Sequence, residues 1–123
     1  MNTNPARILV VDDSPTVVEA VRGALAGDGY EVFTAYDGIE ALDLIKKQHV
    51  DLILLDIDMP RMNGYQVCKL LKRDPNFNSI PVVMLTAKTS EADRLWGIKA
   101  GSDEYITKPF DYMKVKEVLK RFL

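Results

Sequence analysis

The sequence contains one cysteine, one histidine and one tryptophan among its 123 residues. Cys68 alone can form neither an internal disulfide nor a multi-cysteine metal site, and a reducing compartment suits it. No apolar run approaches the roughly 20 residues of a membrane-spanning helix, and residues 1–6 lack the pattern of a signal peptide. We therefore expect a cytoplasmic protein that is neither exported nor inserted into a membrane.

A basic tract is also absent. The formal net charge is −2, and the lysines and arginines are scattered along the chain, so direct binding to nucleic acid is not expected. Hydrophobic residues make up 47% and charged residues 28%, as in an ordinary globular protein. The length suffices for one core. We expect a single domain over residues 7–123 after a short N-terminal extension, residues 1–6.

Apolar runs of strand length alternate five times with amphipathic stretches of helix length. The runs at 52–55 and 82–85 are wholly apolar, which is typical of strands covered on both faces, whereas residues 30–35 suit an edge strand. The pattern predicts an α/β fold with a five-stranded parallel sheet flanked by five helices. Right-handed crossovers favour the flavodoxin-like, doubly wound strand order 2-1-3-4-5, with its switch point between strands one and three.

Helix boundaries are marked by capping residues. Ser14 and Pro15 predict the start of the first helix, which Gly27 and Gly29 end. Further helices are expected over residues 38–47, between residues 63 and 74, over residues 90–99, and after residue 111.

Apolar spacing predicts the inward faces of two of these helices. In the third, Leu70 is expected to face the core together with its neighbour Leu71. In the fourth, Leu95 and Ile98 can serve the core three residues apart, which would leave Trp96 rotated toward solvent.

Polar side chains follow four of the predicted strands at the point where each strand ends. They are Asp12 and Asp13 after 8–11, Asp56 after 52–55, Thr86 after 82–85, and Lys108 after 105–107. Because the carboxyl ends of parallel strands meet at one edge, we expect these groups to gather where open α/β sheets bind ligands. Three carboxylates, a hydroxyl and a lysine together suit a hard divalent cation and a phosphoryl group.

The residue types also suggest roles. Mg²⁺ is typically held by one or two carboxylates plus phosphate oxygens, so Asp13 and Asp56 could bind it directly, with Asp12 acting through water. A neutralised cluster would let one carboxylate attack phosphorus and form an acyl phosphate, and Asp56 is the better nucleophile because its strand is central. Lys108 could offset phosphoryl charge, and Thr86 could donate a hydrogen bond to a phosphoryl oxygen.

These residues lie in five ordered motifs. They are Val10-Val11-Asp12-Asp13-Ser14, Leu54-Leu55-Asp56-Ile57-Asp58-Met59-Pro60, Met84-Leu85-Thr86-Ala87, Ala100-Gly101-Ser102-Asp103-Glu104-Tyr105 and Thr107-Lys108-Pro109-Phe110. With them, residues 7–123 closely resemble the receiver domain of two-component response regulators, the family of CheY-like domains. No signature residue departs from the family pattern.

The resemblance implies that Asp56 accepts a phosphoryl group from a histidine kinase, a phosphotransfer protein or a small donor such as acetyl phosphate. Asp13, Asp56 and the backbone carbonyl of Asp58 would hold Mg²⁺, for which Mn²⁺ could substitute, and Asp12 would lie just outside the direct ligands. Thr86 and Lys108 would contact the phosphoryl group. The Lys108–Pro109 bond would be a cis peptide.

The resemblance also implies regulatory positions. Asp58 and Lys88, two residues after the acceptor and after Thr86, would tune the lifetime of the phosphoryl group. Thr86 and Tyr105 would form the switch, in which the hydroxyl moves toward the phosphoryl group and the ring turns inward. An output face would then change, and we assign Trp96, Lys99 and Tyr105 to it.

The implied activity is that of a phosphorylation-activated signalling switch in a phosphorelay. Such a protein promotes only its own phosphorylation and dephosphorylation and is otherwise not an enzyme. Its implied partners are the kinase or phosphotransfer protein and a downstream protein target. A phosphorylation-dependent homodimer is left open.

Three alternatives accompany this interpretation. Asp56-Ile57-Asp58 imitates the nucleophile and acid/base pair of haloacid dehalogenase phosphatases, although that class has the motif on its first strand. A flavodoxin-type cofactor binder would share the fold but needs a hydroxyl- and glycine-rich loop after the first strand. The chain could also be a receiver from a larger regulator. The final helix ends at Leu123 without a linker, which favours a stand-alone protein.

Overall fold

Strands and helices alternate throughout the computed structural model, which describes residues 4–87, 91–109 and 111–123. The strands are β1 (Arg7–Val11), β2 (Glu31–Ala35), β3 (Leu52–Asp56), β4 (Val82–Thr86) and β5 (Glu104–Thr107). The helices are α1 (Pro15–Gly27), α2 (Gly38–Lys47), α3 (Gly64–Arg73), α4 (Glu91–Ala100) and α5 (Tyr112–Phe122). Among the helices in these ranges, none has the length and hydrophobicity of a membrane-spanning segment.

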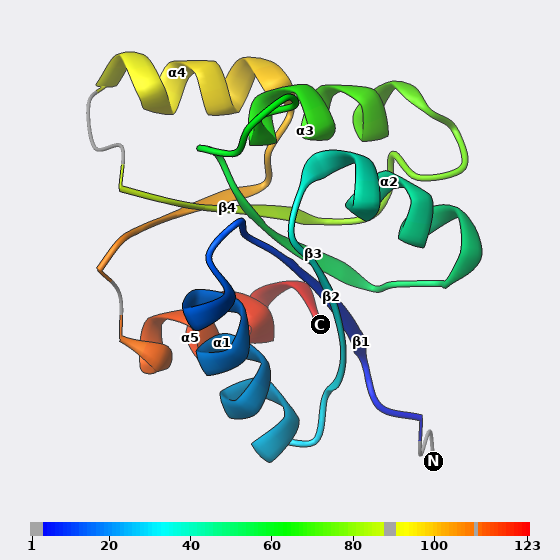
Figure 1. Ribbon diagram of the computed structural model, residues 1–123, viewed down its shortest axis with the longest axis vertical. Helices are drawn as coiled ribbons and strands as arrows, with labels where there is room; N and C mark the ends of the chain where they lie inside the picture. Colours follow the sequence, from blue (N-terminus) through cyan, green and yellow to red (C-terminus); the bar gives the residue numbers. More distant parts are fainter. Residues whose placement is uncertain (1–3, 88–90, 110) are drawn as a thin grey trace.

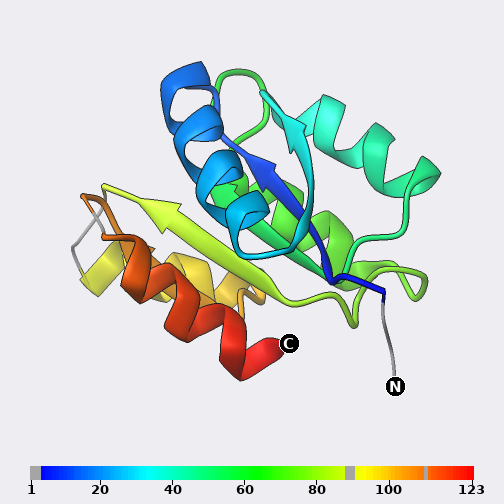
Figure 2. The same cartoon turned by 90° about the horizontal axis from the view of Figure 1, so that it is seen from below.

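All five strands are parallel, in the order β2-β1-β3-β4-β5, so the predicted fold class and strand order are confirmed. Helices α2, α3 and α4 cover one face of the sheet, and α1 and α5 cover the other (Figures 1 and 2). Val11 of β1 is in register with Ala35 and Leu55, and Asp56 of β3 with Leu85. The strands therefore end at nearly the same level along one edge.

The sheet separates two apolar cores. One lies between the sheet and α2, α3 and α4, and the other between the sheet and α1 and α5. Every residue of β3 and of β4 is buried, as their wholly apolar runs predict, because helices cover both faces of these strands. β2 is an edge strand, as expected.

The helix ends follow the capping signals. The Val17 backbone N–H donates to the Ser14 hydroxyl oxygen at 3.4 Å, which marks the start of α1. At α3, Asn63 and Gln66 form a reciprocal capping box, in which each side-chain oxygen accepts from the other residue's backbone N–H, at 3.0 and 2.9 Å. Asp111 caps α5, and α2 has its predicted bounds. The predicted first residue of the fourth helix, Ser90, lies outside the described residues.

Three predictions of inward-facing residues are wrong. Leu70, Leu95 and Ile98 are 46%, 57% and 69% exposed. In α3 the buried stripe follows Val67, Cys68 and Leu71, and Leu70 lies one residue off it. In α4 the buried residues among the described side chains are the small Gly97 and Ala100, so the larger apolar side chains point outward.

Lys72, near the end of α3, connects this helix to the segments that precede β4 and β5. The Lys72 ammonium donates to the carbonyl of Ile80 and to a carboxylate oxygen of Asp103, each at 2.9 Å. The same Asp103 oxygen accepts from the Val82 backbone N–H at 2.8 Å. The charge of Lys72 is thus used inside the fold rather than offered to solvent.

Gly64, the first residue of α3, lies directly against the end of β3. A Cβ atom there would overlap the carbonyl oxygen of Asp56 and approach the Ile57 Cα atom to 2.9 Å. These are backbone atoms, which cannot rotate away as a flexible side chain would. The absence of a side chain at Gly64 is therefore what lets α3 begin this close to Asp56.

We predict that Gly64→Ala lowers the free energy of unfolding by about 2 kcal/mol or more, because the backbone of α3 or of β3 must shift. Urea unfolding followed by circular dichroism measures this. Gly23→Ala is the matched control, since a Cβ atom at that exposed position in α1 meets nothing within 4 Å. The free energy of unfolding of this control should rise by about 0.5–1 kcal/mol, because alanine has the higher helix propensity. Equal stability of the two variants would contradict the prediction.

Candidate functional site

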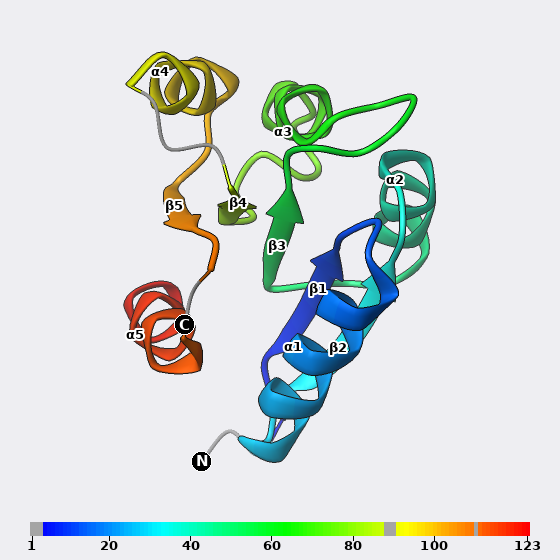
Figure 3. The ribbon, with the colours of Figure 1, turned by 60° about the vertical axis from the view of Figure 1, so that its left-hand side comes forward.

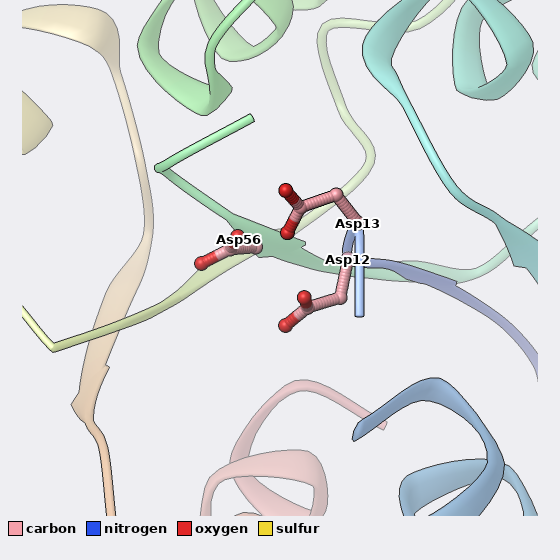
Figure 4. A group of neighbouring side chains, drawn as sticks. All are labelled: Asp12, Asp13 and Asp56. Carbon is pink, nitrogen blue, oxygen red and sulfur yellow. The ribbon is translucent and has the colours of Figure 1, made fainter. Parts of the chain in front are cut away.

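Three carboxylates meet at the carboxyl ends of β1 and β3. Asp12 and Asp13 follow β1, Asp56 ends β3, and one oxygen of each lies within 4.8 Å of the other two (Figure 4). Asp12 and Asp56 are buried, only 1% and 4% exposed, whereas Asp13 is exposed. The cluster that the strand-end pattern predicts is therefore present, with Asp13 on its open side.

Asp12 is held by the protein on both of its carboxylate oxygens. Oδ1 accepts from the Ser14 backbone N–H at 2.9 Å, and Oδ2 accepts from the Lys108 ammonium at 2.6 Å. Its backbone N–H donates to the carbonyl of Ala35 at 3.2 Å. An acid fixed in this way suits an indirect role at a metal site, beside two carboxylates that are less engaged.

Lys108 links the two buried acids. Its ammonium also donates to Asp56 Oδ1, at 3.3 Å, and its backbone N–H donates to the carbonyl of Thr86 at 2.6 Å. The Lys108–Pro109 peptide is cis, as the family resemblance implies. A single lysine charge thus lies between Asp12 and Asp56.

Burial and crowding make ionisation of Asp56 costly. Burial, followed by the negative charge of Asp12, raises the pKa of Asp56 from 3.8 to about 6; Lys108 opposes this shift and Asp13 adds to it. Burial alone would lower the pKa of Lys108, but its hydrogen bond to Asp12 and the charge of Asp56 outweigh burial and raise it. Three acids around one lysine leave an excess of two negative charges, which a divalent cation with oxygen ligands would match.

The other predicted site residues lie on neighbouring elements. Thr86 is fully buried at the end of β4, the next strand after β3 in the sheet. Tyr105 is half-buried on β5, in register with Met84. Asp58 is exposed in the loop after β3. Lys88 lies outside the described residues.

Two of the three residues assigned to the output face, Trp96 and Lys99, lie on α4, and the third, Tyr105, is on β5. Trp96 is 57% exposed, as expected. The Lys99 ammonium lies 5.5 Å from the centroid of the Trp96 ring, within range of a cation–π interaction. Both residues are therefore available at the surface.

Sequence reasoning missed the ion pair that anchors the loop after Asp56. Arg61 has a φ of 67°, which is uncommon outside glycine, and its guanidinium donates to Asp37 Oδ2 at 2.9 Å. Oδ1 of the same Asp37 caps α2. The Asn63-Gly64 pair signals that a turn ends here, but no local pattern signals the conformation of Arg61 or its distant partner.

Comparison with protein families gives the identity of this arrangement. A family model described as the response regulator receiver domain matches residues 8–120. The chain is a response regulator receiver domain. Receiver domains are phosphorylation-activated switches of two-component signalling, and this membership favours the receiver over the phosphatase and flavodoxin alternatives.

The receiver is also similar to individual proteins. It is 42% identical over 121 residues to the DNA-binding response regulator MtrA of Mycolicibacterium smegmatis, which covers 98% of this chain and 50% of MtrA. The chain thus spans about half the length of the curated relatives it matches. Chemotaxis protein CheY4 of Vibrio cholerae has a TM-score of 0.93 at 35% identity, covering 98% of this chain and all of that one.

A third similar protein was solved with ligands. Response regulator TrrA of Thermotoga maritima, in complex with Mg²⁺ and a beryllium fluoride, has a TM-score of 0.86 at 36% identity. The comparison covers 96% of the receiver and 99% of TrrA.

The raised pKa of Asp56 predicts a pH-dependent cost to stability. Between about pH 4 and pH 6 the folded chain retains a proton on Asp56 that the unfolded chain has released, so stability falls as the pH rises through this window. Without divalent cations, Asp56→Asn should therefore be more stable than wild type by about 1–3 kcal/mol above pH 6. The difference should shrink toward zero near pH 4.

Urea unfolding over this pH range tests the prediction. Asp43→Asn, which alters an exposed acid on α2, is the control and should leave stability within about 0.5 kcal/mol of wild type. A gain for Asp56→Asn that does not vary with pH would contradict the assigned cause.

Proposed function

We propose that Asp56 is the phosphoryl acceptor of this receiver. The observation that carries the proposal is the environment of its carboxylate, which is buried at the end of the central strand and contacted by the Lys108 ammonium at 3.3 Å. The negative charges of Asp12 and Asp13 disfavour the ionised form of Asp56. A bound cation counteracts those charges and so favours the ionised, nucleophilic form of Asp56. Asp12 is not proposed as the acceptor because both of its carboxylate oxygens already accept hydrogen bonds. Asp13 is not proposed because it is exposed.

The proposed chemistry is a phosphoryl transfer to Asp56. A carboxylate oxygen forms a bond to phosphorus while the bond from phosphorus to the donor's nitrogen or oxygen breaks, and the bond electrons leave with the donor. A histidine kinase, a phosphotransfer protein or acetyl phosphate would be the donor. Lys108 can exchange part of its contact with Asp56 for a phosphoryl oxygen, and the Thr86 hydroxyl can donate to another.

We assign Mg²⁺ to the carboxylate cluster. Asp13, Asp56 and the backbone carbonyl of Asp58 would hold it, with Asp12 acting through water, and Mn²⁺ would substitute because it favours the same oxygen ligands. When bound, the cation supplies positive charge against the phosphoryl oxygens. The chain's own contribution is to fix Asp12 and Asp56 before the cation arrives, through Ser14 and Lys108.

Thr86 and Tyr105 are proposed to transmit the change. Thr86 ends β4 beside Asp56, and Tyr105 is on the next strand, so a shift of the hydroxyl toward the phosphoryl group would free space near the half-buried ring. The surface formed by Trp96, Lys99 and Tyr105 would then alter its fit to a downstream protein. Asp58 and Lys88 are proposed to set the phosphoryl lifetime.

Phosphoryl uptake is the direct test. Incubation with acetyl phosphate and Mg²⁺ should give one phosphoryl adduct by intact mass, and chelation of the metal should abolish it. Asp56→Asn should give no adduct, while Asp43→Asn, the matched exposed acid on α2, should behave as wild type. An adduct on Asp56→Asn would show that the acceptor is a different residue.

Mg²⁺ binding tests the ligand assignment separately. Isothermal titration calorimetry of Asp13→Asn should show Mg²⁺ affinity at least roughly tenfold below wild type, because one direct carboxylate is lost. Wild-type affinity should fall as the pH drops below about 6, where Asp56 takes up a proton. Unchanged affinity in Asp13→Asn would remove that residue from the ligand set.

A further inference from the structure

A cleft of about 540 Å³ lies between α3 and α4, outside the acidic site. The two helices run side by side on one face of the sheet (Figures 1 and 3). The cleft is lined in part by Ile57 and Asp58, which directly follow Asp56. Its walls include Asn63, Tyr65, Gln66, Lys69, Trp96 and Lys99.

Two lysines give the cleft an unbalanced positive charge. Lys69 on α3 and Lys99 on α4 are exposed, and within the described ranges neither forms an ion pair. Lys72, one turn after Lys69, differs because Asp103 neutralises it. The two cleft lysines thus remain available to an anionic partner, and Asp58, which also lines the cleft, is the acid that opposes them.

The polar side chains at the start of α3 add donors rather than acceptors. In the capping box, the side-chain oxygens of Asn63 and Gln66 already accept backbone N–H groups. Their NH₂ groups are the donors left for a ligand. A group that matches the cleft therefore supplies acceptors, as a carboxylate does.

An apolar surface continues from the cleft onto α4. Trp96 in the wall is 57% exposed, and Leu95, one turn before Lys99 on the outer side of the helix, is equally exposed. Partly exposed tryptophan beside a basic residue is typical of residues that dominate protein interfaces. A small ligand would fill the cleft but would leave Leu95 uncovered, whereas a protein segment can cover both.

We propose that the α3–α4 cleft binds an acidic segment of a partner protein in which carboxylates flank an aromatic side chain. The carboxylates pair with Lys69 and Lys99, and the aromatic side chain packs against Trp96. The partner contacts Ile57 and Asp58, next to the acceptor strand. The inference rests on the proposed function only in that the segment belongs to a signalling partner of the receiver.

Trp96 makes the proposal directly measurable, because it is the only tryptophan and its fluorescence reports on the cleft. The probe is a short acetylated peptide in which aspartate and glutamate flank a phenylalanine. Saturable change of the fluorescence is expected. Two control peptides, one with lysines for the acids and one with alanine for the phenylalanine, should bind at least roughly fivefold more weakly. Equal binding of either control peptide, or no fluorescence change, would overturn the proposal.

Receptor variants assign the contacts. Lys69→Gln and Lys99→Gln should each lower the affinity for the peptide by about threefold, and the double variant should lower it further. Added salt should lower the affinity of the wild-type protein. Trp96→Leu should bind the peptide about tenfold more weakly. Because this variant lacks the tryptophan, its binding is measured by the fluorescence polarisation of a fluorescein-labelled peptide. Lys46→Gln on α2 removes an exposed lysine from outside the cleft and is the charge-matched control. An equal loss in Lys46→Gln would mean general charge attraction and overturn the site.

Two further measurements separate the competing explanations. If phenylacetate binds as tightly as the peptide, the occupant is a small anion and not a protein segment. Phosphoryl uptake is measured by mass on the same preparation. An adduct on Asp56 without peptide binding overturns the cleft alone, whereas peptide binding without an adduct overturns the acceptor assignment and supports the cleft.

Discussion

Repulsion between the buried carboxylates of Asp12 and Asp56 is the constraint on which the site depends. In water such charges would be screened, but at the ends of β1 and β3 they are held close together and away from solvent. Burial and this repulsion together raise the pKa of Asp56, and Lys108 offsets them only in part. The fold thus holds an excess of negative charge at one point. A bound cation reduces this excess, and an added phosphoryl group increases it.

Burial of the apolar strands offsets the free-energy cost of this arrangement. β3 and β4 are buried over their whole length, and the free energy of burying them holds the strand ends in register. Gly64 then allows α3 to begin against Asp56. The site is consequently rigid on the side of the sheet, where the acids are fixed, and open on the side of Asp13.

Local patterns predicted the fold and the acidic cluster well, because both follow from short-range information. An apolar run that ends in an acid specifies a buried strand and a strand-end carboxylate at once, as for Asp56. The failures need knowledge of what covers each helix. Leu95 and Ile98 have a plausible inward spacing, yet α4 packs through Gly97, and no pattern within the helix reveals this. The Arg61–Asp37 pair joins distant segments and is likewise invisible to local reasoning.

The packing of α4 has a consequence for motion. Among residues 95–100, whose burial is described, the buried ones are Gly97 and Ala100, which carry no long side chain to interlock with the core. Large side chains must leave fitted holes before a helix can shift, whereas a smooth face of small residues slides with little loss of contact. Over residues 95–100, α4 therefore loses less packing on a small displacement than a helix anchored by large buried side chains, such as α3 with Val67 and Leu71.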